Sequence, residues 1–312
     1  MRVIEVESAG LLTTVQDLGR PGYGAMAVSA SGAADAVSLR VGNRLVGNDE
    51  GAAALEMTLL GGTFRFPHGG VVALAGSEFE AKIDGMAVEF WAAREVRAGE
   101  VLRIGPTKSG ARCYLCVQGG IAVKAFLGSA STHLLTGIGG YAGRALRKGD
   151  LLRIGETQAA FRKRRVERAV FEKLKPRKTL RVTPGPQNGW FSGAAQKQFL
   201  ETTYRVSEET NRMGLRLEGA ALPDLPHGDM ITEGIPLGAV QITSAGLPII
   251  LFVEQQTTGG YAKIASVIAA DLHSVGQLRP RDEIRFQAVD FEAARRALAE
   301  QEKWIGECVV EG

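Results

Sequence analysis

Residues 10–35 read GLLTTVQDLGRPGYGAMAVSASGAAD, and this stretch changes character in its middle. Its first part alternates like a β-strand, with Leu11, Thr13 and Val15 on one face. The remainder is a loop too rich in glycine for a stable helix or a long strand. Loops held between rigid elements often carry binding and catalytic groups. The polar candidates in this loop are Gln16, Asp17, Arg20, Ser31 and Asp35.

The segment that follows, residues 33–47, predicts an amphipathic helix. In AADAVSLRVGNRLVG the apolar residues Val37, Val41 and Leu45 recur every four positions, and Gly47 is a typical helix end. Asp35 stands near the helix start. It is either a cap that stabilises the first turn or a catalytic carboxylate.

Length and composition predict a mainly β protein (a β-rich α+β fold). A chain of 312 residues is long enough for about two domains. Its 40 glycines follow no repeat period, which indicates many turns and bulges. Residues 54–155 read as short strands between glycine turns, and Asp84-Gly85 between two alternating runs predicts a hairpin.

One pattern occurs in both halves of the chain: a basic turn, an acidic residue, then an apolar–Arg–apolar strand. Its copies are VRAGEVLRIGP (96–106), LRKGDLLRIGE (146–156) and LRPRDEIRFQA (278–288). A unit repeated in both halves suggests two related β-domains. We predict a first β-domain at 1–156, a basic linker at 157–178 and a second β-domain at 179–312.

Three peripheral helices are expected in the second half. One spans 192–204, with Ser192 as its N-cap. A second follows the turn at 257–260, with an apolar face made of Ile264, Ile268 and Leu272. A closing helix spans 290–305 and is expected to bury Phe291, Leu298, Trp304 and Ile305.

The sequence argues against several classes of protein. The net charge is +3, and the basic run 162–165 has no interleaved aromatic residues, so we expect a solvated surface and no nucleic-acid partner. Cys113 and Cys116 fall on opposite faces of an expected strand, and the four histidines lack ligand spacing, so no metal site is expected. There is no P-loop motif, signal peptide or apolar run of about 20 residues. We therefore expect a cytoplasmic protein without a membrane partner.

A second group of candidates lies at residues 254–260, EQQTTGG, at an expected strand-to-helix junction. Backbone N–H groups at a helix start can approach an anion, and Gln256 and Thr257 add side-chain donors. Asn211 and Arg212 offer an amide and a guanidinium that suit a carboxylate or a phosphate. The alternative is that the arginines here pair with surface acids.

Eight blocks in this order resemble one known family: TTVQDLGRPGYG, SGAAD, GNRLVGNDEGAAALEMTL, YLCVQGGI, LGSASTHLLTGIGGYAGRALRKGD, NRMGLRLEG, GAVQITSAGLPIIL and QTTGGYAKIASVI. The chain is similar to the biotin-dependent carboxyltransferase family, also labelled allophanate hydrolase subunit 2. The resemblance covers residues 1–290. It implies two cyclophilin-like β-barrel domains.

The resemblance also implies an enzyme subunit that acts on a small amide. The most similar activity is an ATP-dependent hydrolase that opens the lactam of 5-oxo-L-proline to L-glutamate. Such a subunit would work with a companion of related cyclophilin-like fold and with a lactam-hydrolase subunit, and the complex would use ATP.

Under this resemblance the candidate site holds amides, carboxylates and guanidinium groups, which can donate to an amide carbonyl and accept from its N–H. The catalytic candidates are Gln16, Asp17, Arg20 and Arg212. The substrate-binding candidates are Ser31, Asp35, Asn43, Asn211, Gln241, Glu254, Gln256, Thr257, Gly259 and Gly260. The sequence departs from the family at Glu254, where aspartate is expected, and at His133, where an acid is more usual.

Two other functions stay open at this point. One is a carboxyltransferase that acts on urea or a related amide; biotin would then arrive on another protein, because the chain has no Met-Lys-Met carrier sequence. The other is a non-enzymatic module that binds a kinase-inhibitor partner.

Overall fold

The computed structural model describes residues 2–158, 160–225 and 230–311, which form two compact units. The first unit comprises the residues up to Arg20, Ser31–Lys175 and the residues from Lys303 onward; the second comprises Pro21–Ala30 and Pro176–Glu302. In the second unit the segment 21–30 is held at Ser29, whose hydroxyl donates to the carbonyl oxygen of Val253 at 3.1 Å. The three-part division with a linker at 157–178 stays a prediction.

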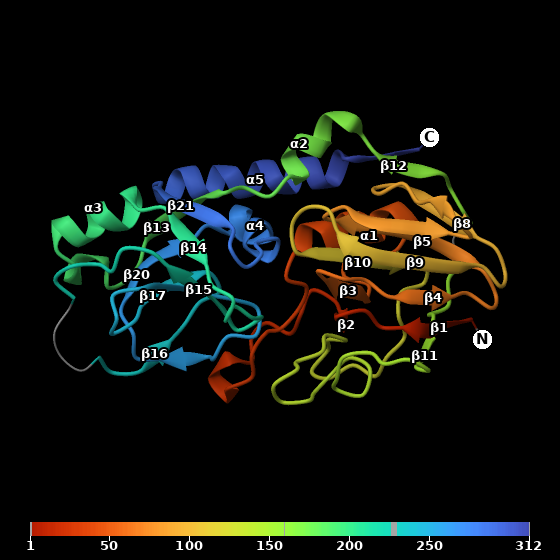
Figure 1. The fold of residues 1–312 in the computed structure, drawn as a ribbon, viewed down its shortest axis with the longest axis horizontal. Helices are drawn as coiled ribbons and strands as arrows, with labels where there is room; N and C mark the ends of the chain where they lie inside the picture. The colour runs from red at the N-terminus through yellow and green to blue at the C-terminus, as the bar shows by residue number, and fades with distance from the viewer. Residues whose placement is uncertain (1, 159, 226–229, 312) are drawn as a thin grey trace. The chain divides into compact units, whose positions relative to one another are not determined.

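The described part of the first unit is built on two antiparallel sheets that share one core (Figure 1). One sheet has the order β11-β1-β4-β9-β6-β7, with β1 (Val3–Ser8), β4 (Thr63–Arg65), β6 (Phe79–Ile83), β7 (Met86–Ala87), β9 (Val101–Thr107) and β11 (Leu151–Arg153). The other has the order β2-β3-β10-β5-β8, with β2 (Leu12–Gln16), β3 (Ala54–Thr58), β5 (Gly70–Gly76), β8 (Ala93–Val96) and β10 (Arg112–Val117). Buried side chains from both sheets, such as Phe64 and Leu115, belong to the same hydrophobic cluster. The unit also contains β12 (Arg164–Val166), paired with β22 (Val309–Glu311), and the short helix α2 (Phe171–Leu174).

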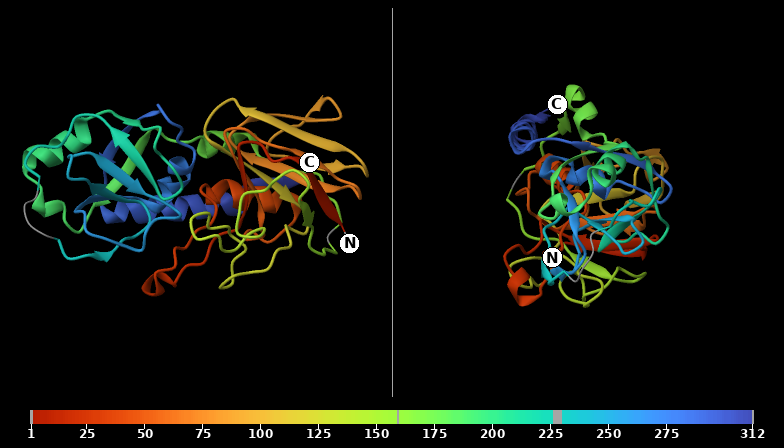
Figure 2. Two further views of the ribbon diagram at one scale, coloured as in Figure 1. Left: turned by 60° about the horizontal axis from the view of Figure 1, so that its bottom comes forward. Right: turned by 90° about the vertical axis from the view of Figure 1, so that its left-hand side faces the viewer.

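Helix α1 (Ala36–Val46) packs on β5 and β10, and it confirms the helix predicted at 33–47 (Figures 1 and 2). Asp35 caps its start by accepting the backbone N–H of Ser38 at 2.9 Å, and Gly47 ends it with a positive φ of 79°. A Cβ at Gly42 would lie 2.6 Å from the sulfur of Cys116. The helix therefore lies close against β10 because position 42 carries no side chain.

Strand β10 carries the two cysteines on opposite faces, as predicted. Cys113 belongs to the core between the sheets, and Cys116 belongs to the cluster under α1. Burial raises the pKa of both thiols. Both are therefore protonated, inert core residues near neutral pH.

The second unit contains a closed β-barrel in its described residues (Figure 1). Its order is β13-β20-β17-β18-β15-β14-β21, closed by parallel pairing of β21 with β13. The strands are β13 (Thr179–Pro184), β14 (Tyr204–Val206), β15 (Gly214–Glu218), β17 (Ala239–Ile242), β18 (Pro248–Leu251), β20 (Lys263–Val267) and β21 (Glu283–Ala288). Helix α3 (Gly193–Glu201) is capped by Ser192 as predicted, and its Phe199 stacks on Phe286 of β21 with ring centroids 4.5 Å apart. The mainly β class is thus confirmed, with the barrel in this unit and two sheets in the first.

The helix predicted after residue 257 is wrong. Thr258–Gly259 form β19, which pairs with β16 (Glu233–Gly234), and the next residues form the barrel strand β20. Within the span predicted as helix, the helical residues are a 3-10 turn at 269–271 and the start of α4 (Leu272–Gly276). Strand β20 is largely buried on both faces, and the helical spacing joins residues of different elements: Ile264 lies in β20, Ile268 follows it and Leu272 starts α4.

The closing helix is confirmed as α5 (Phe291–Glu307), but its predicted buried face is partly wrong. Phe291 is 70% exposed and Leu298 is also exposed, whereas Ile305 is fully buried and Trp304 partly buried. Gln301 is buried instead, and its amide donates to the carbonyl oxygen of Ala270 at 2.9 Å. The helices in the described part of the chain are all too short or too polar to cross a bilayer.

The repeated pattern corresponds to a repeated turn. In each copy the acidic side chain accepts the backbone N–H of the residue three positions earlier at 2.8 Å; these pairs are Glu100–Arg97, Asp150–Arg147 and Asp282–Arg279. The residue before each acid has a positive φ: Gly99 at 88°, Gly149 at 90° and Arg281 at 73°. The strands β9, β11 and β21 follow these turns. The sequence pattern therefore encodes a local hydrogen bond that starts a strand.

We expect Asp150→Asn to destabilise the protein in a pH-dependent way. Asp150 accepts two further hydrogen bonds of 2.8 Å from the guanidinium of Arg144, and chiefly for this reason its pKa lies below the usual 3.8. The variant should lower the free energy of unfolding near neutral pH by about 2 kcal/mol, because charge-assisted hydrogen bonds are lost. Since the folded pKa is lowered, this contribution is present above a pH of about 4 and disappears as the pH falls through the folded pKa.

The matched control is Glu100→Gln, which changes the acid of a more exposed copy of the turn and should cost less than about 0.5 kcal/mol. Urea unfolding at a series of pH values measures both variants. Equal losses for the two, or an Asp150→Asn loss that persists in acid, would contradict this account.

Candidate functional site

Asp17 follows strand β2 and braces the first unit's polar loop. Its carboxylate accepts hydrogen bonds from the backbone N–H groups of Gly19 (2.7 Å) and Ala130 (2.6 Å), and from the hydroxyls of Ser129 (2.6 Å) and Ser131 (2.5 Å). The residue is 9% exposed. A buried carboxylate is stabilised when several donors converge on it. These bonds fix residues 129–131 against the end of β2.

Arg20 binds the same segment. It is fully buried, and its guanidinium donates to the carbonyl oxygens of Ser131 and Phe126, the latter at 3.3 Å. Its Cζ lies 5.7 Å from the centre of the Phe126 ring. Arg20 thus stabilises main-chain carbonyls of a segment that lies outside the named strands, although the carbonyl oxygen of Phe126 also accepts the backbone N–H of Ser129.

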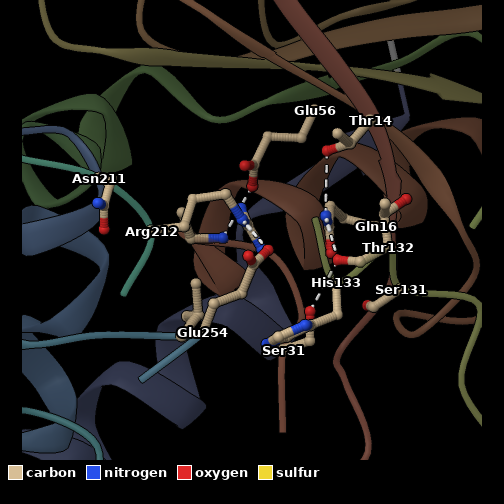
Figure 3. Close-up of polar contacts among 12 residues, drawn as sticks. Thr14, Gln16, Ser31, Glu56, Ser131, Thr132, His133, Asn211, Arg212 and Glu254 are labelled. Carbon is tan, nitrogen blue, oxygen red and sulfur yellow. Dashed lines mark hydrogen bonds and ion pairs between the residues drawn. The ribbon is translucent and has the colours of Figure 1, made fainter. Parts of the chain in front are cut away.

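The carbonyl oxygen of Thr132 accepts hydrogen bonds from two further candidates, Gln16 and Ser31 (Figure 3). The Nε2 of Gln16 and the hydroxyl of Ser31 both donate to it, at 3.1 and 2.8 Å. Gln16 Nε2 also donates to the hydroxyl of Thr14 at 3.0 Å. The Oε1 of Gln16 is buried and has no hydrogen-bond partner among the described residues. Gln16 therefore keeps an unused acceptor.

His133, where the sequence departs from the family, follows this carbonyl. Its Nδ1 lies 2.7 Å from the hydroxyl of Thr136 and accepts the Thr136 backbone N–H at 3.3 Å. The Nδ1 side of the ring is therefore engaged by Thr136.

Asp35 and Asn43 lie at opposite ends of α1, and the side chain of each bonds to residues nearby in the sequence. Besides its cap, Asp35 accepts the hydroxyl of Ser38 at 2.6 Å. The amide of Asn43 donates to the carbonyl oxygens of Ala52 (2.7 Å) and Glu50 (3.2 Å). In the first unit, Gln16, Asp17, Arg20 and Ser31 therefore gather around residues 126–132, whereas Asn43 does not.

A buried network around Glu56 was missed by sequence reasoning. Glu56 of β3 accepts the hydroxyl of Tyr114 at 2.6 Å and the backbone N–H of Ala34 at 2.8 Å. Tyr114 in turn accepts the backbone N–H of Asp35 at 2.8 Å. Burial, and then the charge of Glu56, raises the pKa of Tyr114 well above its usual range. The available signal was one glutamate inside the apolar strand ALEMT.

Arg212 and Glu254 form a buried ion pair in the second unit (Figure 3). Arg212 Nε lies 2.5 Å from Glu254 Oε1, and the backbone N–H of Glu254 donates to the carbonyl oxygen of Arg212 at 2.9 Å. Asn211 beside them accepts the backbone N–H of Met213 on its Oδ1 at 2.8 Å. Breaking a buried pair of this kind leaves an uncompensated charge.

A pocket of about 220 Å³ in the second unit brings together three predicted residues. They are Asn211, Gln241 and Gln256. The remaining lining residues are Glu209, Met213, Gly214, Arg216, Ile249, Leu251 and Tyr261. Tyr261 lies in the block QTTGGYAKIASVI and Arg216 in the block NRMGLRLEG, but neither was among the predicted site residues. No sequence pattern selects Glu209.

The turn 257–260 leads into strands, so the helix start predicted to present backbone N–H groups there is wrong. Thr257 accepts the backbone N–H of Ile235 at 3.0 Å, and Gly259 lies in β19. A Cβ on Gly259 would lie 2.9 Å from Gln256 Nε2 and 3.2 Å from Gln241 Nε2. Gly259, which has no side chain, therefore lies close to the side-chain amides of Gln256 and Gln241. A Cβ on Gly260 would be 3.6 Å from the carbonyl oxygen of Met230.

The described residues contain no group of three His, Cys, Asp or Glu side chains arranged to hold a metal ion. The assignment of catalytic and substrate-binding roles to the candidates stays a prediction.

We expect Asp17→Asn to unfold the polar loop. An amide at this position turns one acceptor oxygen into a donor that faces Gly19 or Ala130, so the loss should be about 2–3 kcal/mol. The control is Asp290→Asn at the exposed start of α5, where Asp290 accepts the N–H of Ala293; asparagine caps a helix equally well, so little change is expected. Thermal unfolding measures both variants. A wild-type melting temperature for Asp17→Asn would overturn the bracing role.

Comparison with known proteins agrees with the fold and the sequence blocks. A family model described as carboxyltransferase domain, subdomain A and B, matches residues 26–288. The 5-oxoprolinase C subunit of Escherichia coli (strain K12) is 37% identical over 97% of this chain and 96% of that protein; that of Haemophilus influenzae is 34% identical over the same shares. The crystal structure of the K. lactis urea amidolyase has a TM-score of 0.91 at 31% identity, covering 99% of this chain and 20% of that chain. The chain therefore belongs to the family of the carboxyltransferase domain, subdomain A and B.

Proposed function

We propose that this chain is the C-type subunit of an ATP-dependent 5-oxoprolinase. Together with companion subunits it would open the lactam of 5-oxo-L-proline to L-glutamate in the cytoplasm. The observation that carries the proposal is the match to two bacterial 5-oxoprolinase C subunits along 96% of their own length. The chain spans only 20% of the urea amidolyase that it resembles in structure. The same proposal includes a cyclophilin-like fold for both halves of this chain and for one companion subunit.

The pocket of the second unit supports a small substrate. At about 220 Å³ it is smaller than the roughly 300–1,000 Å³ typical of sites for drug-sized ligands. Its size and its lack of a phosphate-binding loop do not fit a nucleotide. ATP would therefore bind to a companion subunit.

The lining chemistry supports an amide as substrate. The Nε2 groups of Gln241 and Gln256 can donate to a carbonyl oxygen, and the side chains of Asn211 and Glu209 can accept from a lactam N–H. Opening a lactam places negative charge on the carbonyl oxygen, and fixed donors directed at that oxygen stabilise it. In this view the chain binds and polarises the amide while the companions complete the reaction.

A second candidate is a carboxyltransferase that acts on urea or a related amide. It is favoured by the TM-score of 0.91 with urea amidolyase. The amide-lined pocket also suits the ureido group of biotin, which carries the same carbonyl and N–H groups; Gln241 and Gln256 would hold it. Biotin would supply the carboxyl group, delivered on another protein.

Reconstitution separates the two candidates. We expect the purified chain, mixed with its companion subunits, to release L-glutamate from 5-oxo-L-proline only when ATP is present. Avidin should not inhibit this release, because no biotin takes part. A folded complex that releases no glutamate would refute the proposal, and avidin-sensitive, bicarbonate-dependent turnover of urea would support the second candidate instead.

A further inference from the structure

The pocket lies on the outer face of the barrel, and strand register explains why. Arg216 of β15 pairs with Ile249 of β18, and Ile249 pairs with Gln241 of β17. The neighbours Leu215 and Ile250 are buried in the barrel interior. Because side chains alternate along a strand, Arg216, Ile249 and Gln241 form a row across three strands on the opposite face.

A second row of residues beside the first contributes the glycine and leucine of the pocket lining. Gly214 pairs with Leu251, and both line the pocket. A Cβ at Gly214 would lie 3.1 Å from Ile249 Cγ2 and 3.2 Å from the carbonyl oxygen of Ile250. The backbone at position 214 therefore lies close against Ile249, and a side chain there would crowd this part of the pocket lining.

One wall of the pocket carries paired amides. Gln241 is buried, and its Nε2 donates to the carbonyl oxygen of Tyr261 at 3.2 Å. Gln256 Nε2 approaches the same glycine, Gly259, as Gln241 Nε2 does. Two amide groups thus converge on the pocket from different strands and loops, which is the arrangement that recognises an amide ligand.

The opposite part of the row carries a cation. Arg216 Nε lies 3.8 Å from Glu209 Oε2, and the two side chains are 55% and 78% exposed. An ion pair this long and this exposed is weak, so a ligand anion can compete with Glu209 for the guanidinium. A planar guanidinium is the group best suited to bind a carboxylate through two parallel hydrogen bonds.

We propose that this pocket binds a small lactam that carries a carboxylate, with Arg216 on the carboxylate and Gln241 and Gln256 on the amide. The ring methylenes lie on Ile249 and Leu251. This inference rests on the proposed function for its choice of ligand, 5-oxo-L-proline, and it makes Arg216 the residue that determines specificity for the carboxylate.

The test compares two ligands that differ only in the carboxylate, 5-oxo-L-proline and 2-pyrrolidinone. Their binding to the full chain in its reconstituted complex is measured by calorimetry. Arg216→Gln should weaken 5-oxo-L-proline about 10- to 100-fold and leave 2-pyrrolidinone unchanged, because only the first ligand uses the charge-assisted contact. Gln241→Leu should weaken both ligands.

The matched control is Arg205→Gln, which removes another exposed barrel arginine that pairs with Glu218 and does not line the pocket. It should bind both ligands like the wild type, and circular dichroism verifies that each variant is folded. Wild-type affinity of Arg216→Gln for 5-oxo-L-proline, or equal weakening of both ligands, would overturn the inference.

If the complex releases no glutamate yet binding depends on Arg216, the proposed function fails and the pocket assignment stands. If glutamate release is intact and its KM is unchanged in Arg216→Gln, the pocket assignment fails and the function stands.

Discussion

The carboxylate of Asp17 is the constraint on which the first unit's polar loop depends. Its hydrogen bonds from residues 129–131 hold a segment without regular secondary structure against the end of β2. Arg20 satisfies carbonyl oxygens of the same segment. Asp17 and Arg20 are both engaged in holding this segment. Much of the polar character of the loop is therefore structural. Gln16 differs, because its Oε1 is buried without a hydrogen-bond partner among the described residues.

The second unit positions its polar groups through barrel register. Alternation along β15, β17 and β18 directs Leu215 and Ile250 to one face of the sheet, and it directs Arg216, Ile249 and Gln241 to the face that lines the pocket. The pair β16–β19 keeps Gly259 against the amides, and the lack of a side chain there is required by the spacing of those groups. A rigid sheet with adaptable loops above it is a common basis for small-molecule recognition.

Features encoded by local chemistry were predictable from the sequence. The cap and end of α1, the hairpin at Asp84-Gly85 and the repeated acidic turns each rest on residues a few positions apart. Features that depend on distant pairing were not. The helical spacing after residue 257 joins residues of different elements, and the contact of Glu56 with Tyr114 joins residues 58 positions apart. The pocket lining was partly predictable, because Asn211, Gln241 and Gln256 lie in family blocks and were selected as candidates. Tyr261 lies in a block but was not selected, and Glu209 lies outside the blocks and reaches the pocket only through the fold.

The central claim is that the barrel pocket of the second unit recognises the ligand while Asp17 braces the first unit's loop. A crystal structure of the chain with bound 5-oxo-L-proline tests this most directly. The account predicts the ligand carboxylate on Arg216, its amide on Gln241 and Gln256, and the hydrogen bonds of Asp17 to residues 129–131 unchanged. A ligand bound to Asp17 or Arg20, with those loop bonds broken and the barrel pocket free of ligand, would contradict it.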